Sequence, residues 1–553
     1  METEVVVVGA GPIGAVMAAE LGRRGIGCVV VEQTDGEFKD PRLHAVTIRT
    51  MELARKWGIT QELRNCGWPQ EHPQDASYVT SLTGHEVARI PWAPIARMQP
   101  PPESPTFAQR CPQAWFNPIL HRYASRFESV RLLWKHKYLG LSQDEQGVSV
   151  EVEPAEGGPS FTIRCKYVVG CDGARSKVRE HLGVEYKSSG VFGHAAEAIV
   201  QSREIAEITR ARLAGRYTSV TDNGVSVTML PYDGIDRFRI VLFAEPSGVD
   251  QERMDEALER LVGRKVEYKY LTGVLPWVNR ERVVEKFRVG RVFLAGDAAH
   301  TTPPAGGHGM NTGVLDSFDL GWKLAAALQG WGGEALLDSY EYERKTGAVR
   351  TIAMAGELYA EWHKVKPLLD KDLPLLKLET PEGDAARQRV GELIVQTFTK
   401  EYNATGVSIG YRYSGSPVLV EDGTPEPADD YVRFEQTARP GHRLPHAWLK
   451  DGRSTLDLVD DVLTLIEVGA DTVSRAFEAA AAAKGIPLVV HRVEEPHIAR
   501  LFDATAVLVR PDQFVAWRAK GNDLSPAQVL DVVTGRGAAP VRRGEDCAAE
   551  SLT

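Results

Sequence analysis

The hydrophobic positions at the start of the chain predict a strand, a helix and a second strand in close succession. Glu4 to Val8 is a nearly continuous apolar run, and Gly27 to Val31 is another that ends on Glu32. Between them lies a glycine-rich turn followed by a helix-length segment, Gly9-Ala10-Gly11-Pro12-Ile13-Gly14. Short apolar runs bounded by turn residues are typical of buried parallel strands. The pattern therefore predicts a βαβ unit.

Apolar and alternating segments further along predict a second sheet and then a run of helices. A helix is expected over Ala45 to Trp57. Strands are expected over 76–93, 129–170, Val225 to Leu230, Arg237 to Ala244 and Glu267 to Thr272, with a helix near 251–262. Helices should predominate from 307 to about 400. Residues 404–450 carry many prolines and glycines and predict an extended, irregular segment.

The last hundred residues have a pattern of their own. We expect strands at Val462 to Val468, Pro487 to Val493, Ala506 to Val509 and Phe514 to Trp517. Helices are expected from Asp471 to Lys484 and from Ser525 onward. This β-α-β-β-β-α order predicts a separate α/β unit. The tail after about residue 537 is expected to be disordered.

The glycines of the first turn suggest nucleotide binding. One glycine allows the tight turn, one allows the backbone to approach a pyrophosphate, and one allows close packing of helix on strand. The helix then directs unsatisfied N–H groups at the anion. Glu32 is positioned to accept hydrogen bonds from ribose hydroxyls. The alternative is a glycine turn in another α/β fold, and the turn alone does not separate NAD from FAD.

Composition narrows the class of protein. The chain has 553 residues, which suggests two or three domains, and 43% hydrophobic residues. A net charge of −10 argues against nucleic acid or an anionic membrane as partner. No apolar run could span a bilayer, and the acidic start does not look like a signal peptide. The six cysteines show no metal or CxxC spacing, which suggests a cytoplasmic protein with reduced thiols and no metal site.

Two later motifs carry a family resemblance. An apolar strand leads into an Asp-Gly turn at residues 167–176, and another ends in Gly-Asp at residues 290–300. Together with the first glycines they resemble the FAD-dependent aromatic hydroxylases, the p-hydroxybenzoate hydroxylase and phenol hydroxylase family. Five further segments resemble the branch of this family that holds the rebeccamycin-type oxygenase and the bacterial chlorophenol hydroxylases. They are residues 31–36, 51–53, 67–69, 438–443 and 445–449.

The resemblance implies an α/β fold with three parts. A Rossmann-like FAD-binding domain is expected over 1–75, 101–184 and 285–400. An inserted β-sheet domain for substrate is expected over 76–100 and 185–284. An extended linker over 401–449 would lead to a thioredoxin-like domain over 450–537, with 538–553 as the tail. A homo-oligomer is left open.

The resemblance also assigns residues. The flavin-facing loop would supply Pro304, Gly309 and Met310 at the reaction centre. Tyr232 and Arg239 could touch a phenolate, with packed strand residues as the alternative. His300 is expected to bond its own loop rather than act as a base. FAD would be held non-covalently by Gly9, Gly11, Pro12, Ile13, Gly14, Glu32, Gln33, Arg42, Gln113, Asp172, Gly296, Asp297, Pro304, Gly307, Gly309, Met310 and Asn311.

The implied activity is hydroxylation of a phenolic or hydroxypyridine-like ring by FAD, O2 and NADPH or NADH. Reduced flavin would react with oxygen to give a C4a-hydroperoxide that transfers OH to the ring. Aromatic catabolism and natural-product tailoring are both open. The alternatives are attack on a large polycyclic scaffold, a flavin oxidoreductase that inserts no oxygen, and a non-catalytic flavoprotein that binds an intermediate.

Overall fold

The predicted βαβ unit forms the centre of a six-stranded sheet. The computed structural model describes residues 1–37, 45–221, 224–244, 248–469 and 472–537. In the sheet order β18-β19-β11-β1-β2-β7, β1 pairs in parallel with both β2 and β11. The strands are β1 Val5–Val8, β2 Cys28–Glu32, β7 Val130–Trp134, β11 Tyr167–Gly170, β18 Arg288–Val289 and β19 Val292–Leu294. The near-complete burial of β1, β2, β11 and β19 agrees with the apolar runs in the sequence.

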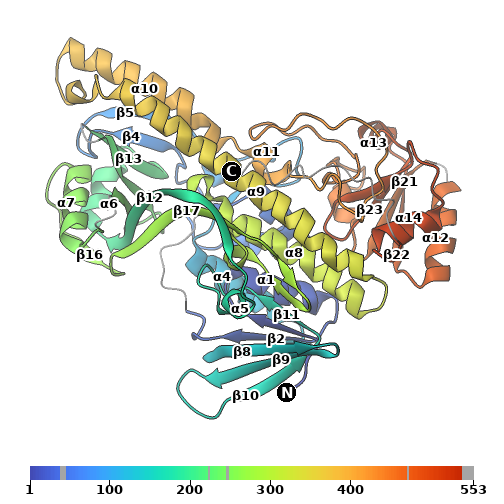
Figure 1. The fold of residues 1–553 in the computed structure, drawn as a ribbon. Helices are drawn as coiled ribbons and strands as arrows, with labels where there is room; N and C mark the ends of the chain where they lie inside the picture. Colours follow the sequence, from blue (N-terminus) through green and yellow to red (C-terminus); the bar gives the residue numbers. More distant parts are fainter. Residues whose placement is uncertain (38–44, 222–223, 245–247, 470–471, 538–553) are drawn as a thin grey trace.

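Helices and a smaller sheet cover the two faces of this first sheet (Figure 1). Helix α1, Pro12–Arg23, packs against α4, Gln113–Ala124, and α8, His308–Leu328. The smaller sheet has the order β10-β9-β8. Its strands are β8 His136–Asp144, β9 Gly147–Pro154 and β10 Phe161–Cys165. The short elements nearby are β3 Ala45–Val46, α2 Ile48–Lys56, α3 Thr60–Arg64, β6 Gln109–Arg110 and α5 Lys177–His181.

A nine-stranded second sheet lies beside the first. Its order is β20-β17-β12-β15-β14-β13-β4-β5, and β16 pairs with β12. The strands are β4 Ala76–Val79, β5 Glu86–Ile90, β12 Tyr186–Gln201, β13 Arg216–Thr221, β14 Gly224–Pro231, β15 Arg237–Ala244, β16 Lys269–Tyr270, β17 Leu275–Val284 and β20 His300–Thr301. Helices α6, Arg203–Arg210, and α7, Gln251–Val262, lie beside it.

Two long helices connect this sheet to the rest of the molecule. Helix α9, Glu334–Leu369, packs on α8, and α10, Pro381–Tyr402, packs on β5. Val390 and Ile394 of α10 share an apolar cluster with Ala76 and Ile90 of β4 and β5. Beyond α10 comes a short helix, α11 Thr405–Ile409, and then a largely irregular segment. The end of α10 is therefore anchored against the second sheet.

Residues 437–537, the C-terminal unit, form a four-stranded sheet of order β22-β21-β23-β24. Strand β21 pairs in parallel with β22 and antiparallel with β23. The strands are β21 Leu463–Val468, β22 Leu488–Val493, β23 Ala506–Val509 and β24 Val515–Arg518, and the helices are α12 Thr472–Lys484, α13 Pro496–Phe502 and α14 Pro526–Val533.

Two sequence-based expectations need correction. We predicted no helix between the second and third strands of the C-terminal unit, but α13 lies there; at seven residues it is too short to show a clear helical period. We also predicted a helix from Ala45, whereas Ala45–Val46 pair with β6 and the helix begins at Ile48. Pairing with a distant strand overrode the local preference there.

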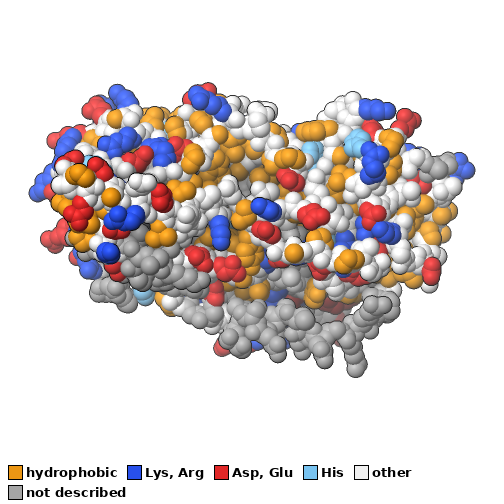
Figure 2. Space-filling view, turned by 90° about the horizontal axis from the view of Figure 1, so that it is seen from above, with side chains coloured by type: hydrophobic (Ala, Val, Ile, Leu, Met, Phe, Trp, Pro, Cys, Tyr) orange, Lys and Arg blue, Asp and Glu red, His pale blue; other side chains and the backbone are white. Residues whose placement is uncertain are grey.

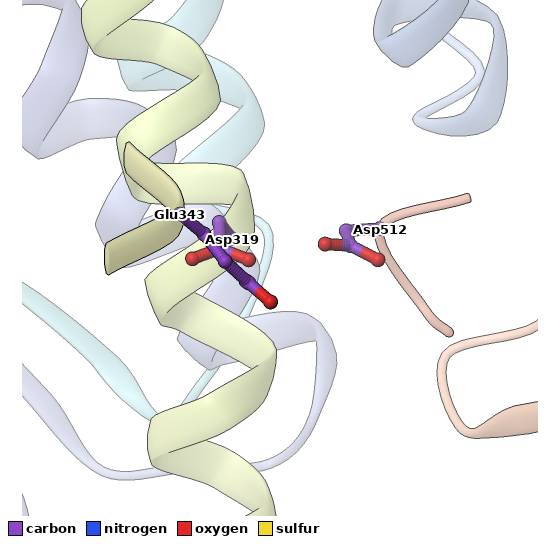
Figure 3. Close-up of side chains that lie close together, drawn as sticks. All are labelled: Asp319, Glu343 and Asp512. Carbon is purple, nitrogen blue, oxygen red and sulfur yellow. The ribbon is translucent and has the colours of Figure 1, made fainter. Parts of the chain in front are cut away.

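The C-terminal unit is joined to α8 and α9 by a buried ionic cluster. Asp319 of α8, Glu343 of α9 and Asp512 of the β23–β24 turn have carboxylate oxygens within 4.8 Å of one another, and Figure 3 shows Asp512 pointing toward the other two. Lys323 and Arg510 lie among them. Arg510 contacts Glu343 at 2.5 Å and Asp512 at 2.5 Å. We therefore describe the group as an ion-pair network between two parts of the fold.

The surface carries both signs of charge. On the face shown in Figure 2, the described acidic and basic side chains are interspersed, with apolar side chains between them. Among the described residues, no helix is both long enough and apolar enough to cross a membrane.

Candidate active site

One continuous cavity of about 1130 Å³ runs from the glycine turn after β1 to the second sheet. Its walls come from the first sheet, the second sheet and the end of α10. Ligands in open α/β sheets bind at the carboxyl ends of the strands, where the glycine turn lies. The cavity joins two regions that are separate in the sequence, the nucleotide-binding motifs and the second sheet.

The glycines after β1 have three different environments. Gly9 has φ +99°, and a Cβ there would lie 2.6 Å from the Cys171 carbonyl oxygen. A Cβ at Gly14 would lie 1.9 Å from the Gly9 carbonyl oxygen. A Cβ at Gly11 would have nothing within 4 Å and would project into open space. Gly9 and Gly14 are therefore required by packing, whereas the absent Gly11 side chain leaves room for a ligand.

The N-terminus of α1 is available to an anion. Its N-cap residue is Gly11, which provides no side-chain cap, and Pro12 occupies the first turn. Uncapped N–H groups and the helix dipole together attract negative charge. Gly11, Pro12 and Ile13 all line the cavity.

Glu32 lies at the end of β2 and also lines the cavity. One carboxylate oxygen accepts a hydrogen bond from the Ala10 N–H at 2.8 Å, and the other accepts from Thr34 N–H and Oγ1, each at 2.9 Å. These bonds fix the orientation of the carboxylate. Because each oxygen has two lone pairs, Oε2 can still accept a hydrogen bond from a ligand, whereas Oε1 already accepts two.

The Gly-Asp turn is held from behind by Asp316 of α8. This fully buried carboxylate accepts hydrogen bonds from the Gly296 N–H at 2.9 Å, His300 Nε2 at 2.7 Å and Arg344 Nε at 2.8 Å. Burial alone raises the pKa of Asp316, but His300 and Arg344 more than reverse this and lower it. Asp297, the next residue along the turn, lines the cavity.

The loop before α8 bends sharply toward the cavity. Gly306 and Gly307 have φ +71° and +69°, in the left-handed region that favours glycine. Gly307 is the N-cap of α8 and provides no side-chain cap, so N–H groups near Gly309 and Met310 are available to a ligand. The α8 N-terminus thus provides a second anion-attracting helix end in the same cavity.

Asn311 connects this loop to the segment at residues 45–50. Its Oδ1 accepts from Thr47 N–H at 3.0 Å and Thr50 Oγ1 at 2.8 Å. Its Nδ2 donates to the Ala45 and Gly307 carbonyls at 3.1 and 2.9 Å. Both Nδ2 hydrogens are therefore committed within the protein, and Asn311 does not line the cavity.

Asp172 caps α5 and faces the cavity. Its Oδ2 accepts from the N–H groups of Lys177 at 2.7 Å and Val178 at 3.2 Å. Its Oδ1 is buried without a protein partner, and burial raises the pKa of this carboxyl. Arg175 lines the same part of the cavity. Asp172 therefore caps α5 through Oδ2 and leaves Oδ1 available to a ligand.

The far end of the cavity is formed by side chains on several elements. Arg239 donates to Glu197 Oε2 from Nε at 3.0 Å. Arg216 Nη1 donates to Glu401 Oε1 at 3.1 Å, and the same oxygen accepts from the Gly306 N–H at 3.4 Å. The lining residues here are Trp92, Arg110, Arg216, Leu230, Arg239, Glu401 and Tyr402. The hydrogen bond from the Gly306 N–H to Glu401 therefore connects the far end to the loop before α8.

Most of the predicted site residues meet at this cavity. The lining includes Gly9, Gly11, Pro12, Ile13, Glu32, Gln33, Gln113, Asp172, Asp297, Pro304, Gly307, Gly309, Met310 and Arg239. Gly14, Gly296 and Asn311 lie behind the lining, and Tyr232 does not reach it. Arg42 lies outside the described residues.

Sequence reasoning missed most of the far end. Arg110 lies three residues before Gln113, which we assigned to FAD binding, and this proximity was a usable signal. Glu401 and Tyr402 gave no signal, because only the packing of α10 on the second sheet brings them to the cavity.

His308 is buried near Arg350, and its pKa is lowered by burial to about 4, so at neutral pH it is uncharged.

The fold and this cavity define a dinucleotide-binding α/β protein with an additional ligand region on a second sheet. Models of two protein families match the chain. The "FAD binding domain" covers residues 2–355, and "Aromatic-ring hydroxylase, C-terminal" covers residues 437–536. The chain belongs to the FAD-binding aromatic-ring hydroxylase family.

Known proteins are similar over nearly the whole chain. A phenol 2-monooxygenase of Pseudomonas sp. (strain EST1001) is 30% identical, covering 97% of this chain and 93% of its own. The structure of RebC soaked with chromopyrrolic acid, with bound 7-carboxy-K252c, has a TM-score of 0.89 at 33% identity, covering 97% and 100%. The complex of an aklavinone-11 hydroxylase with FAD and aklavinone has a TM-score of 0.77 at 28% identity, covering 97% and 99%.

The family establishes the cofactor and the class of enzyme. FAD is the cofactor, NAD(P)H is the reductant typical of the family, and the protein is an aromatic hydroxylase. The family resemblance, the enzyme class and the cofactor that we predicted from the sequence are thereby confirmed. The cavity fits FAD independently: it has two uncapped helix N-termini, open space at Gly11 and an unpartnered carboxylate oxygen on Asp172.

Proposed function

We propose that this protein hydroxylates an electron-rich aromatic ring, phenolic or hydroxypyridine-like, using FAD, NAD(P)H and O2. The observation that carries the proposal is the continuity of the cavity from the glycine turn to the second sheet. Its volume of about 1130 Å³ exceeds the roughly 300–1,000 Å³ of a site for one small ligand. It is large enough for a cofactor and a second molecule in contact with it.

The proposed roles follow from the positions of the side chains. Gly11 and the α1 N-terminus would bind the pyrophosphate, and Glu32 and Asp297 would accept hydrogen bonds from ribose and ribityl hydroxyls. When bound, FAD supplies transfer of electrons from NAD(P)H and activation of oxygen. The uncapped N-terminus of α8, near Gly309 and Met310, would stabilise negative charge on the adjacent ring edge.

The second sheet would place the substrate ring against this edge and exclude water. Leu230, Trp92 and Tyr402 provide apolar surface at that end. Of the two residues first suggested for the substrate, only Arg239 lines the cavity, and its bond to Glu197 suggests that it positions the sheet. We infer that substrate contacts come instead from residues on β5–β6, β13 and α10.

We also infer that the C-terminal unit is thioredoxin-like and structural. The inference is supported by the order β22-β21-β23-β24, with β21 and β22 parallel and β23 and β24 antiparallel. Thiol–disulfide exchange needs a thiolate nucleophile. Residues 437–537 contain no cysteine, so redox exchange is excluded on chemical grounds. Its network with α8 and α9 suggests that it supports the helix that begins at the cavity.

The test uses the purified, FAD-loaded protein. A panel of phenols, hydroxypyridines and polycyclic phenols is screened for faster oxidation of NADPH and NADH, and products are then formed under labelled oxygen gas. The proposal expects one labelled oxygen atom in an aromatic product. Stimulated oxidation that gives an unlabelled product would identify a flavin oxidoreductase. Tight ligand binding without any stimulation would identify a binding protein, and either result would overturn the proposal.

A further inference from the structure

We propose that the far end of the cavity binds a carboxylate carried by the aromatic substrate, and that Arg110 is the residue that recognises it. This rests on the proposed function, because it names the substrate class of the same site. The observation behind the proposal is an excess of positive charge among the described residues of that end. We define the far end by the lining residues Trp92, Arg110, Arg216, Leu230, Arg239, Glu401 and Tyr402.

Three guanidinium groups line the far end, and two of them have carboxylate partners. Arg239 is paired with Glu197, and Arg216 with Glu401 at 3.1 Å. Arg110 is the exception. Its one hydrogen bond goes to the Gly215 carbonyl at 3.1 Å, and no carboxylate of the described residues pairs with it. Arg110 is half-buried, and charges that are largely shielded from water are normally paired, so the unpaired guanidinium makes this end of the cavity suitable for an anionic ligand.

Arg110 is fixed in place rather than free to swing into solvent. Its guanidinium lies over the Trp68 ring, 5.0 Å from the centroid, and Trp68 is itself buried. Gly215 allows β13 to approach closely: a Cβ there would lie 2.9 Å from Arg110 Nη2 and 2.8 Å from the Gln74 carbonyl oxygen. The ring and the strand therefore set the position of the guanidinium before any ligand binds.

The surroundings of Arg110 favour an anion. Burial, together with the nearby positive charge of Arg216, lowers the pKa of the Arg110 guanidinium to about 10. At neutral pH the group is still charged, so burial of its charge is a cost that an anion would offset. A planar carboxylate matches the paired N–H donors of a guanidinium in number and direction.

The position of Arg110 also indicates which part of the substrate would carry the acid. Arg216 is connected through Glu401 to the Gly306 N–H of the loop before α8. Arg110 is bonded to Gly215, the residue before Arg216, and Trp92 and Tyr402 meet edge to face at a centroid distance of 5.6 Å in the same wall. An aryl carboxylate could place its acid on Arg110 and its ring along this aromatic wall toward the loop.

The test measures binding to the FAD-loaded enzyme by the change in flavin absorbance, without turnover. The probes are 4-hydroxybenzoate and 6-hydroxy-2-naphthoate, each compared with its neutral carboxamide, and 4-nitrophenolate as an anion without a carboxylate. A charge-assisted pair predicts that at least one carboxylate binds roughly 10- to 100-fold more tightly than its amide. Arg110→Met should abolish this preference, and Arg110→Lys should retain part of it.

Arg64→Met is the matched control. Arg64 also lies over an aromatic ring, that of Phe107 at 4.1 Å, but it does not line the cavity. FAD content is measured on every variant first, and Arg110→Lys replaces Arg110→Met if the latter does not fold. The proposal is overturned if no carboxylate is preferred over its amide, including the case in which none binds. It is also overturned if Arg110→Met keeps the preference, if Arg110→Lys keeps it undiminished, or if 4-nitrophenolate binds more tightly than either carboxylate. Oxygen insertion into neutral phenols would leave the proposed function standing in each case.

Discussion

At the scale of single residues, Gly9 and Gly11 have different roles: Gly9 is required by the fold, and Gly11 leaves space for the ligand. Gly11→Ala should leave the stability of the apoprotein within about 0.5 kcal/mol, because the new methyl group meets open space. It should weaken FAD binding by at least about tenfold, or about 1.4 kcal/mol, because the methyl group occupies the place proposed for the pyrophosphate. Denaturant titration of apoprotein and FAD titration measure the two effects.

Gly9→Ala is the matched variant with the opposite expectation. It combines a positive φ with a close approach to the Cys171 carbonyl, so the fold itself should lose about 1–3 kcal/mol. Equal stability of the two apoproteins would show that our distinction between packing and ligand space is wrong.

The thiol of Cys66 is the most reactive one expected among the described cysteines. A hydrogen bond from Cys111 is the main cause that lowers the pKa of Cys66 to about 7, whereas burial raises the pKa of Cys28, Cys111, Cys165 and Cys171. Alkylation of Cys66, mapped by mass spectrometry, should speed up as pH rises through about 7. Cys111→Ala should move this midpoint upward; an unchanged midpoint would contradict the assigned cause.

At the scale of elements, the network between α8, α9 and the β23–β24 turn has an excess of one carboxylate. Burial and the neighbouring negative charges raise the pKa of Asp319 to about 8, so this acid is protonated at pH 7. Although burial opposes it, Arg510 and Lys323 lower the pKa of Glu343 to about 2. The two carboxyl groups, which Figure 3 shows side by side, therefore differ in charge at pH 7: Asp319 is neutral and Glu343 is negative.

This assignment predicts different effects of two isosteric substitutions. Asp319→Asn should change the free energy of unfolding at pH 7 by less than about 1 kcal/mol, because the acid it replaces is already neutral. Glu343→Gln should cost about 3–5 kcal/mol, because it leaves Lys323 and Arg510 short of a negative charge. Chemical denaturation measures both values.

The pH dependence provides a check on the same pair. A carboxyl whose folded pKa is raised from 3.8 to about 8 contributes stability that is complete below 3.8 and is lost as pH rises through 8. This slope should disappear in Asp319→Asn. Equal destabilisation by the two amide variants would mean that the proton resides elsewhere in the network.

Elements defined by local pattern were predictable, and those defined by distant contacts were not. Strand β15 and helix α7 were predicted with their observed bounds, because a full apolar period and clear ends identify them. Strand β3 was taken for helix, because only β6 gives Ala45 its partner. The nucleotide end of the cavity follows from one motif, whereas Glu401 reaches the far end through the packing of a whole helix.

At the scale of the whole molecule, the C-terminal unit and the first sheet share one hydrophobic core. Leu465, Phe514 and Trp517 belong to the same buried cluster as Val7, and the ionic network bridges the same contact. We therefore expect one calorimetric transition for residues 1–537. Two separated transitions, or a chain ending near residue 425 that keeps its FAD and its melting temperature, would contradict this coupling.

Acid should weaken this contact. Asp461 faces Arg23 at 2.5 Å, Arg24 at 3.5 Å and Lys56 at 3.6 Å, and these charges outweigh burial to lower its pKa from 3.8 to about 2. A lowered carboxyl pKa gives stability that is present above pH 3.8 and lost between 3.8 and 2. Asp461→Asn should cost about 2 kcal/mol at pH 7 and flatten the stability curve over that window. An unchanged acid profile would contradict the role of this residue.

The cavity, which spans two sheets, also has a consequence for how such enzymes diversify. Its far end is built from the segment after β5, from β6, β13, β14 and β15, and from the last turn of α10, and none of these carries the glycine turn or the Gly-Asp turn. Substitutions at Trp92, Arg110, Leu230 or Tyr402 can therefore change which substrate binds while the residues that bind the cofactor stay the same. New specificity requires changes at a few codons scattered along the gene, and the cofactor site can be inherited unchanged.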